Sequence, residues 1–437
     1  MMMFFSGITA KPVTAKTDPL ELRSLQQLID ITPTGGTLKL DAGNYAGPAK
    51  VNKRLSIVGE GNAVIVNESS QPAITIAAQD VRLQNFRIDH EGKEDRAAVL
   101  ITANRAAVQG IDIKTESYGI VIRESEGHTI ENSHIVHTQP GAADNPISDR
   151  KNGVDLFNSH NSRIAGNVIE NMHDGIYLES SHRNVIEGNR IEHSRYGIHC
   201  MYTDSTVISR NDGAFNVTGA MVMGVKDAIV KDNTFVKQSE SVNSQGFLFF
   251  DVHTSKIHNN TAQGNRVGLY VEQSDRNEFT NNDVLGNFTG VQFLESQGNR
   301  FTDNRFIGNV IEAEASDSEN NSFRGNYWEA FRGIDVSGDA ISDTAYRVNP
   351  FFQRLTSAVP AFQLYFQSPG MLFLESLNMD GIETWTKDEA PQMRHDFRNA
   401  QSQLPLADHS TSGMLALGLA LLAASLFTIY YLGVRRL

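Results

Sequence analysis

The chain has 437 residues, of which 40% are hydrophobic and 20% are charged, an ordinary composition for a folded protein with a sizeable core. Its formal net charge of −13 argues against a nucleic-acid ligand, because no basic stripe is available to bind phosphates. The single cysteine, Cys200, excludes an intrachain disulfide. The sequence also has no glycine-rich phosphate loop of the Walker type.

The first residues look like part of a signal peptide. Residues 1–17 hold a short apolar run and small residues near Ala15, but no basic segment precedes them, so we expect a truncated signal-like segment. Residues 18–66 are expected to form an N-terminal cap and the first strands. Apolar residues at helical spacing predict a capping helix, since a solenoid must close its open end: Leu20, Leu22, Leu25, Leu28 and Ile29.

A repeat dominates the middle of the chain. Most units begin with a glycine, such as Gly175 or Gly197, followed by alternating apolar residues that indicate short strands. A fixed step of this size indicates a solenoid, whose coils bury apolar faces by stacking on one another. We therefore predict an all-β fold, a right-handed, single-stranded parallel β-helix with 22-residue coils, over residues 67–328. Eight asparagines mark the period, 22 residues apart except for one step of 27: Asn167, Asn189, Asn211, Asn233, Asn260, Asn282, Asn304 and Asn326.

These asparagines are expected to form a structural ladder inside the solenoid. Stacked side-chain amides can hydrogen-bond from coil to coil at a turn, as they do in cross-β assemblies. We assign the ladder no chemistry.

The strand alternation indicates which side chains face outward. Counting from each glycine, the second and fourth residues point out, so His199 and Met201 lie beside Met221 and Met223. Thioether and imidazole ligands are those that monovalent copper selects, so these four residues are candidate metal ligands. An apolar strip covered by the tail, a loop or a partner protein is the alternative. Four residues on neighbouring turns extend the patch: Met172, His173, His182 and His193.

The carboxylates on the same face are relevant to a second possible function, that of a carbohydrate-active β-helix such as a polysaccharide lyase or epimerase. That chemistry needs grouped acids. Asp155 is outward but has no acidic neighbour in its column, and Glu179 and Glu272 lie four coils apart. We interpret each as a solvated charge. Cys200 points inward and is expected to be a buried, inert thiol.

Two insertions interrupt the period, near residues 138–146 and 239–244, and such loops are either functional or merely tolerated. After the last coil, Asp335, Asp339 and Asp343 surround a glycine. This loop is a weak candidate for Ca²⁺, and a structural turn is the preferred interpretation.

The C-terminal part has three predicted regions. Residues 329–383 form an extension that is rich in Phe and Leu, and residues 384–413 form a polar linker. Residues 414–434 lack charges and are long enough to span a bilayer as a helix. Arg435 and Arg436 follow and favour a cytoplasmic C-terminus, which places the β-helix outside the cytoplasm.

Several of these segments together resemble the NosD family of periplasmic β-helix proteins, over about residues 74–377. The segments are Asn152–Phe157, Asp174–Tyr177, Arg195–His199 with Met201, and the Gly-Asn-Tyr-Trp ending at Trp328. The resemblance implies a non-enzymatic accessory protein for maturation of the copper sites of nitrous oxide reductase. It also implies transient Cu(I) binding, and it favours His199, Met201 and Met223; Met221 comes from the stacking argument alone.

Implied partners are the membrane and ATPase subunits of an ABC transporter, nitrous oxide reductase and a copper chaperone. The segment from Phe351 to Leu377 resembles the family's extension and suits docking on the transporter's membrane subunit. Two rival functions stay open, the carbohydrate-active enzyme and a scaffold that grips its partner without copper.

Overall fold

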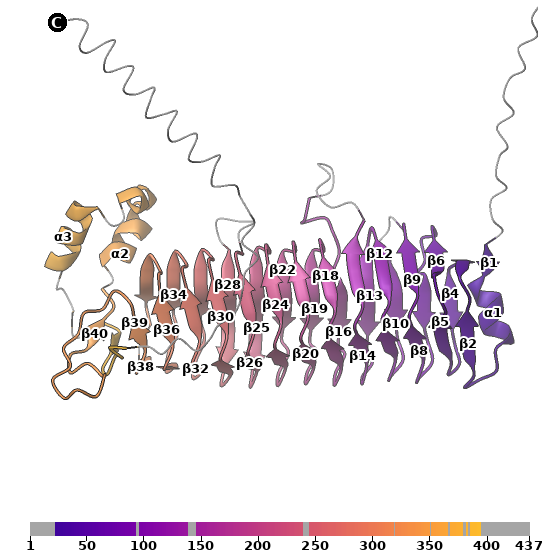
Figure 1. The fold of residues 1–437 in the computed structure, drawn as a ribbon, viewed down its shortest axis with the longest axis horizontal. Helices are drawn as coiled ribbons and strands as arrows, with labels where there is room; N and C mark the ends of the chain where they lie inside the picture. The colour runs from indigo at the N-terminus through magenta and orange to yellow at the C-terminus, as the bar shows by residue number, and fades with distance from the viewer. Residues whose placement is uncertain are drawn as a thin grey trace, which may run out of the picture. The chain divides into compact units, whose positions relative to one another are not determined.

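The computed structural model describes residues 22–394, except for 93–95, 139–145, 239–243, 319, 350, 366–367, 379–381 and 383–384. Within that part of the chain, short strands stack into three sheets along a solenoid (Figure 1). Successive coils place their strands side by side and parallel, which confirms the predicted parallel β-solenoid. Its right-handed sense stays a prediction, based on the strong preference of parallel crossovers.

Each sheet collects every third strand of the chain. The fourteen-stranded sheet contains β1 Arg23–Ser24, β3 Gly43–Ala46, β6 Ala63–Asn67, β9 Arg87–His90, β12 Asp112–Thr115, β15 His134–His137, β18 Val168–Glu170, β21 Arg190–Glu192, β24 Asp212–Ala214, β27 Thr234–Val236, β30 Thr261–Gln263, β33 Asp283–Leu285, β36 Arg305–Ile307 and β39 Tyr327–Trp328. The twelve-stranded sheet contains β4 Ala49–Val51, β7 Ile74–Ile76, β10 Ala97–Ile101, β13 Tyr118–Arg123, β16 Val154–Phe157, β19 Asp174–Glu179, β22 Tyr196–Met201, β25 Thr218–Lys226, β28 Gln245–His253, β31 Val267–Glu272, β34 Thr289–Leu294 and β37 Ile311–Ser316. The fifteen-stranded sheet contains β2 Thr37–Leu40, β5 Ser56–Gly59, β8 Arg82–Gln84, β11 Ala107–Gln109, β14 Thr129–Glu131, β17 Arg163–Ala165, β20 Val185–Glu187, β23 Val207–Ser209, β26 Ile229–Lys231, β29 Lys256–His258, β32 Glu278–Thr280, β35 Arg300–Thr302, β38 Ser322–Arg324, β41 Lys387–Asp388 and β40 Tyr346–Arg347.

The eight asparagines of the repeat lie in one column between the fifteen-stranded and the fourteen-stranded sheet. In Asn189, for example, the backbone N–H and Nδ2–H both donate to Oδ1 of Asn211, at 3.0 Å each. The same pair of bonds joins every neighbouring pair from Asn167 to Asn326. Each Nδ2 also donates to a backbone carbonyl, such as that of Ile164, so the buried amides are satisfied.

The other two corners of the coil carry shorter ladders that the sequence analysis missed. One links Asn265, Asn287 and Asn309, and the other links Asn277, Asn299 and Asn321. These polar columns fix the register of the coils as well as closing their turns. The residue before each of the eight asparagines has a positive φ, which favours Gly, Asn and Asp at that place: Gly166, Gly188, Arg210, Asp232, Asn259, Asn281, Asp303 and Gly325.

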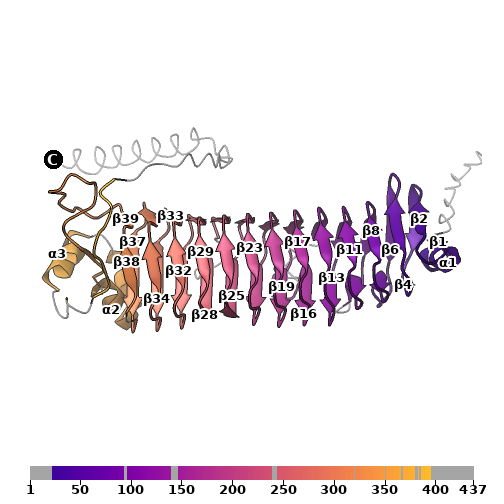
Figure 2. The same cartoon turned by 90° about the horizontal axis from the view of Figure 1, so that it is seen from below.

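The N-terminal end is closed by α1, Leu25–Ile31, which buries Leu25 and Ile29 and packs beside β4. The side chain of Ser24 caps this helix by accepting from Gln27 N–H at 3.4 Å. The strands of residues 37–66 belong to the same three sheets as the later coils (Figure 2).

At the other end, the asparagine ladder finishes on an aspartate from much later in the chain. Oδ2 of buried Asp388 accepts from Asn326 N–H at 3.0 Å, from Asn326 Nδ2–H at 2.8 Å and from Trp328 Nε1–H at 3.1 Å. Asp388 lies in β41, which pairs with β38. The predicted linker therefore begins later than residue 384, because the ladder needs an acceptor and residues 387–388 supply it.

The C-terminal extension is helical, with α2 Phe351–Ala358, the 3₁₀ helix η1 Pro360–Tyr365 and α3 Pro369–Leu377. Exposed apolar side chains are concentrated on η1 and α3, including Leu364 and Phe373. Among the described residues, none of the helices combines the length and apolar character that a bilayer crossing requires. The predicted span at 414–434, residues 1–17 and most of the predicted linker lie outside the described residues.

We predict that Asp388→Ala loosens the last coils, because three buried N–H donors lose their acceptor at a cost of about 1–3 kcal/mol each. Hydrogen–deuterium exchange should speed up around residues 322–328 while the coil that contains Asn189 stays protected. Asp388→Asn, which keeps an amide oxygen at that place, should show a smaller effect. Unchanged protection in Asp388→Ala would mean that the aspartate does not hold the end of the ladder.

Candidate metal and docking surface

The candidate site lies on the outer face of the twelve-stranded sheet. Two outward columns run along this face in register from β13 to β37. One contains Val121, Asp155, Tyr177, His199, Met221, Leu248, Tyr270, Gln292 and Glu314, and the other contains Arg123, Phe157, Glu179, Met201, Met223, Phe250, Glu272, Leu294 and Ser316.

The four predicted metal ligands lie on neighbouring strands, with His199 opposite Met221 and Met201 opposite Met223. The surface around these four residues forms two separate hollows. His199 and Met201 line a hollow of about 580 Å³, the polar pocket, with Arg123, Asp155, His173 and Asp174. Met221 and Met223 line a hollow of about 960 Å³, the long groove, with residues of β28, β31, β34, β37 and α2.

His199 corrects the expectation of a solvent-facing patch, since only 5% of the residue is exposed. The rings of Tyr177 and Tyr196 lie edge-on to its imidazole, with centroids 5.0 and 4.8 Å away. The three methionines are half-buried. The outward direction was predicted from the alternation, but the cover that large neighbouring rings provide was not.

A buried carboxylate orients the imidazole of His199. Nδ1 of His199 lies 2.8 Å from Oδ2 of Asp174, and Arg195 donates to both oxygens of Asp174 at 2.8 and 2.7 Å. Burial alone would raise the pKa of Asp174, but the hydrogen bonds and charges of His199 and Arg195 lower it below its ordinary value. Asp174 is therefore ionised and can only accept, so Nδ1 of His199 carries the proton.

The other ring nitrogen of His199 is left without a partner. Nε2 is buried and makes no hydrogen bond within the part of the chain that the structure describes. An unsatisfied buried nitrogen is costly, whereas a lone pair held in place by a carboxylate on the far side of the ring is the usual arrangement of a histidine that binds metal. The residues present therefore fit a soft cation bound at Nε2.

The other predicted histidines differ in how their ring nitrogens are used. His173 also lines the polar pocket, and its Nδ1 donates to the carbonyl of Ile147 at 2.8 Å, so its Nε2 is free of the proton in the neutral ring. His182 instead accepts the N–H of Asp204 at Nδ1, at 3.0 Å, and stacks on His160. A neutral His182 ring therefore carries its proton on Nε2 and offers no lone pair there.

Two further members of the predicted patch do not join the site. Met172 is fully buried in the core, and His193 stacks on Phe215 at 5.3 Å in a different turn. Among the described residues, no group of three or more His, Cys, Asp and Glu side chains is arranged to hold a metal ion. A metal on this face thus depends on thioether ligands, which Cu(I) accepts more readily than harder ions do.

The acids of the polar pocket also differ from expectation. Asp155 is 4% exposed and forms an ion pair with Arg123 at 2.6 Å, so it is not a solvated charge. Burial raises the pKa of Asp155, although Arg123 and Asn152 act in the opposite direction. Glu179 and Glu272 are half-buried and accept hydrogen bonds from Tyr177 and Tyr270, at 2.8 and 2.9 Å.

Asp174 and Arg195 were missed in the sequence because they precede the glycine from which the alternation is counted: Asp174 is the first residue of β19, and Arg195 directly precedes β22. The one available signal was a polar residue directly before the glycine in successive coils, Asn152 and then Asp174.

Cys200 is buried, as predicted, and burial raises the pKa of its thiol to about 12.

The weak Ca²⁺ candidate has its carboxylates bound to the backbone. Asp335 accepts from Gly338 N–H at 2.6 Å and from Ala340 N–H at 3.0 Å, and Asp343 accepts from Val336 N–H at 2.7 Å. These bonds support the structural-turn interpretation.

The two insertions, whose centres are residues 139–145 and 239–243, lie outside the described residues.

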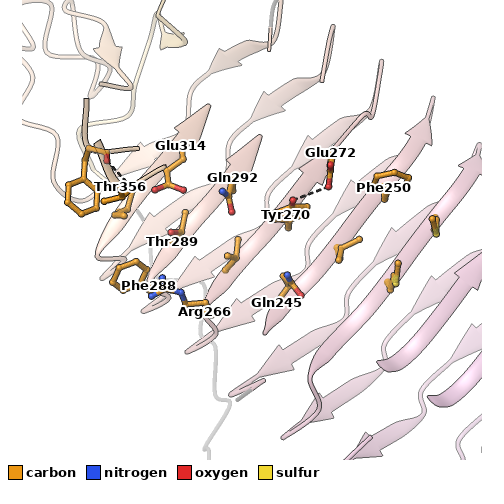
Figure 3. A pocket seen from close by; sticks show the side chains of 16 residues that line it. Gln245, Phe250, Arg266, Tyr270, Glu272, Phe288, Thr289, Gln292, Glu314 and Thr356 are labelled. Atoms are coloured by element: carbon orange, nitrogen blue, oxygen red, sulfur yellow. Dashed lines mark hydrogen bonds between the residues drawn. The ribbon is translucent and has the colours of Figure 1, made fainter. Parts of the chain in front are cut away.

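The long groove is lined by apolar, aromatic and polar side chains together (Figure 3). The guanidinium of Arg266 lies 3.7 Å from the ring centre of Phe288. Glu314 lies at the end of the groove beside Thr356 of α2. Burial raises the pKa of Glu314 to about 7, and Arg266 offsets part of that rise.

Glu314 gives a prediction for pH dependence. Between pH 4.5 and about 7 the folded protein keeps the Glu314 carboxyl protonated, whereas the unfolded chain loses that proton. The free energy of unfolding should therefore fall as pH rises through this window. Glu314→Gln should remove this loss and gain about 1–2 kcal/mol at pH 8 relative to pH 5, after allowance for the group's partial exposure. Denaturant unfolding at both pH values measures it. Equal gains at the two pH values would contradict the buried titration.

Comparisons with known proteins agree with this fold. Solved structures with similar folds include alginate lyase AlyF-OU02 in complex with G6, with 11% identity, a TM-score of 0.51 and coverage of 69% of this chain and 84% of that chain. A Yersinia enterocolitica Family 28 exopolygalacturonase has 11% identity, a TM-score of 0.51 and coverage of 68% and 74%. Bacteriophage phi29 gene product 12 has 13% identity, a TM-score of 0.51 and coverage of 65% and 51%. At such identities these structures show the fold alone.

The sequence itself is matched by a family model. A search of curated proteins found no match. Residues 141–333, which include all four predicted metal ligands, match the model described as "Periplasmic copper-binding protein (NosD)". This match confirms the resemblance seen in the sequence, and over these residues the chain is similar to the NosD family.

Proposed function

We propose that this protein binds Cu(I) transiently on the outer face of the twelve-stranded sheet, as an accessory protein for copper-site assembly in nitrous oxide reductase. The observation that carries the proposal is the buried, unpartnered Nε2 of His199, whose ring Asp174 orients from the other side. The family description adds a copper-related, periplasmic role. In this role the protein is a carrier rather than an enzyme, and copper is its cargo.

The ligand set that supports this role is His199 with Met201, Met221 and Met223. Met201 follows His199 on β22, and Met223 lies next to Met201 on β25. Tyr177 Oη, whose proton is donated to Glu179, lies 3.5 Å from Met201 Sδ. One imidazole and a few half-buried thioethers form an incomplete site, so a partner can supply the missing ligand and take the ion away.

The partners in this proposal are an ABC transporter, a copper chaperone and the reductase. ATP-driven motion belongs to the transporter. The protein would work in the periplasm or on the outer face of the cytoplasmic membrane, anchored by residues 414–434. The exposed apolar side chains of η1 and α3, such as Leu364 and Phe373, suit docking on the membrane subunit.

A carbohydrate-active enzyme is the second candidate, and one observation favours it. The polar pocket groups the Asp174–His199 pair with Asp155 and two arginines, a set that could act on an acidic sugar. However, Arg123 and Arg195 are each already paired with one of these aspartates. Turnover of uronate polymers, absent in His199→Ala, would favour this candidate over the carrier.

Cu(I) affinity tests the proposal directly. Anaerobic competition with a chromophoric Cu(I) chelator should show tight binding by the wild type, and a loss of more than about tenfold in His199→Ala and in Met201→Ala. Asp174→Asn should weaken binding by about 10–100-fold, because such a change removes the carboxylate that orients the ligand. His182→Ala is the matched control, a nearby histidine whose Nδ1 is already an acceptor. Equal affinity in His199→Ala and His182→Ala would reject the site.

Deletion of the gene in its host tests the role in the cell. Nitrous oxide reduction and the copper content of the reductase should fall, and the wild-type gene should restore both. A gene with His199, Met201 and Met223 all changed to Ala should fail to restore them despite normal folding and normal membrane level. Full rescue by the triple variant would leave a copper-independent docking scaffold, and a fully loaded reductase in the deletion strain would reject the maturation role.

A further inference from the structure

The long groove is an extended hollow that begins at the candidate copper ligands. Its lining comes from five neighbouring strands, β25, β28, β31, β34 and β37, and α2 lines it at the far end with Phe352 and Thr356. Four interstrand steps of about 4.8 Å give a length of about 19 Å, enough for about six residues of extended polypeptide. The near end contains Met221 and Met223, which lie opposite His199 and Met201.

The lining of the groove mixes apolar and polar side chains, and its acids outnumber its cations. The apolar part of the lining includes Leu248, Phe250, Val267 and Ile311. Glu272 and Glu314 outnumber the single cation, Arg266, whose guanidinium already covers the ring of Phe288. Figure 3 shows Glu314 and Gln292 on neighbouring strands. Neither side chain has a hydrogen bond to another described residue, although the charge of Arg266 acts on Glu314.

We propose that the long groove docks an extended segment of a copper-handling partner protein, with apolar side chains against Leu248 and Phe250 and a basic side chain at Glu314. This inference rests on the proposed function, because it names the partner chemistry of the same face. The charge of the groove selects a cationic segment. Glu314, whose burial Arg266 offsets only in part, is the place where the basic residue of that segment gains most, since a half-buried carboxylate is only partly screened by water.

The long groove is continuous with the candidate copper ligands, because Met221 and Met223 belong to its lining. A segment that lies along it ends beside Met221 and Met223, one strand from His199. A thioether or imidazole of that segment would then complete the ligand set, and ligand exchange would move Cu(I) between the two proteins. No redox step is needed, because the ion stays Cu(I) on both sides.

The test uses a fluorescein-labelled peptide, Gly-Leu-Met-Leu-Lys-Leu-Met-Leu-Gly, in metal-free buffer with a copper chelator at pH 8, where Glu314 is ionised. Fluorescence anisotropy should show saturable binding to the full chain. The same peptide with Glu in place of Lys should bind at least about tenfold more weakly. Glu314→Lys and Leu248→Asp should each weaken binding of the Lys peptide by a similar factor. Glu278→Lys is the matched control, an exposed acid on β32 of another sheet, and should bind as the wild type does.

Cu(I) affinity of the same variants separates this inference from the proposed function. Glu314→Lys should keep wild-type Cu(I) affinity while it loses the peptide. No peptide binding by the wild type, or equal binding by Glu314→Lys, overturns the docking groove whatever the copper result. If the peptide results hold and the wild type binds no Cu(I), the groove stands as a peptide site and the carrier function fails.

Discussion

The stacking of asparagine side chains is the constraint on which the rest of the structure depends. Each buried amide has its donors and acceptor satisfied only when the next coil places its asparagine directly beside it, as Asn189 and Asn211 do. A coil shifted by one residue would leave these groups unpaired and would turn every side chain to the opposite face. The long ladder thus holds one register from Asn167 to Asn326, and the two shorter ladders at the other corners reinforce it in the last coils.

That register is what creates a functional surface from single residues on separate coils. His199 and Met201 come from one coil, Met221 and Met223 from the next, and Asp174 from the one before. None of these residues is close to all the others in sequence, yet the parallel stacking aligns them within three adjacent strands. The rigid scaffold also lets His199 keep an unsatisfied nitrogen, since the ring cannot turn away from Asp174 to find another partner.

The repeat made the fold predictable, and alternation after each glycine gave the outward columns that hold His199 and Met201. The alternation could not predict the direction of residues that precede each glycine. Asp174 and Arg195 sit before the opening glycine, so their contact with His199 had no local signal. Asp388 ends the ladder from 62 residues after Asn326, a separation that no pattern within a coil can encode. Burial of Asp155 by Arg123 likewise depends on side-chain packing between coils.

X-ray absorption at the copper K-edge of the Cu(I)-loaded protein tests the central claim most directly. The account predicts a Cu(I) edge with both sulfur and imidazole scattering in the wild type. The imidazole contribution should disappear in His199→Ala, and the sulfur contribution should decrease in a variant with Met201 and Met223 changed to Ala. A shell of only light nitrogen or oxygen atoms, unchanged by these substitutions, would contradict a copper site on the outer face of the twelve-stranded sheet.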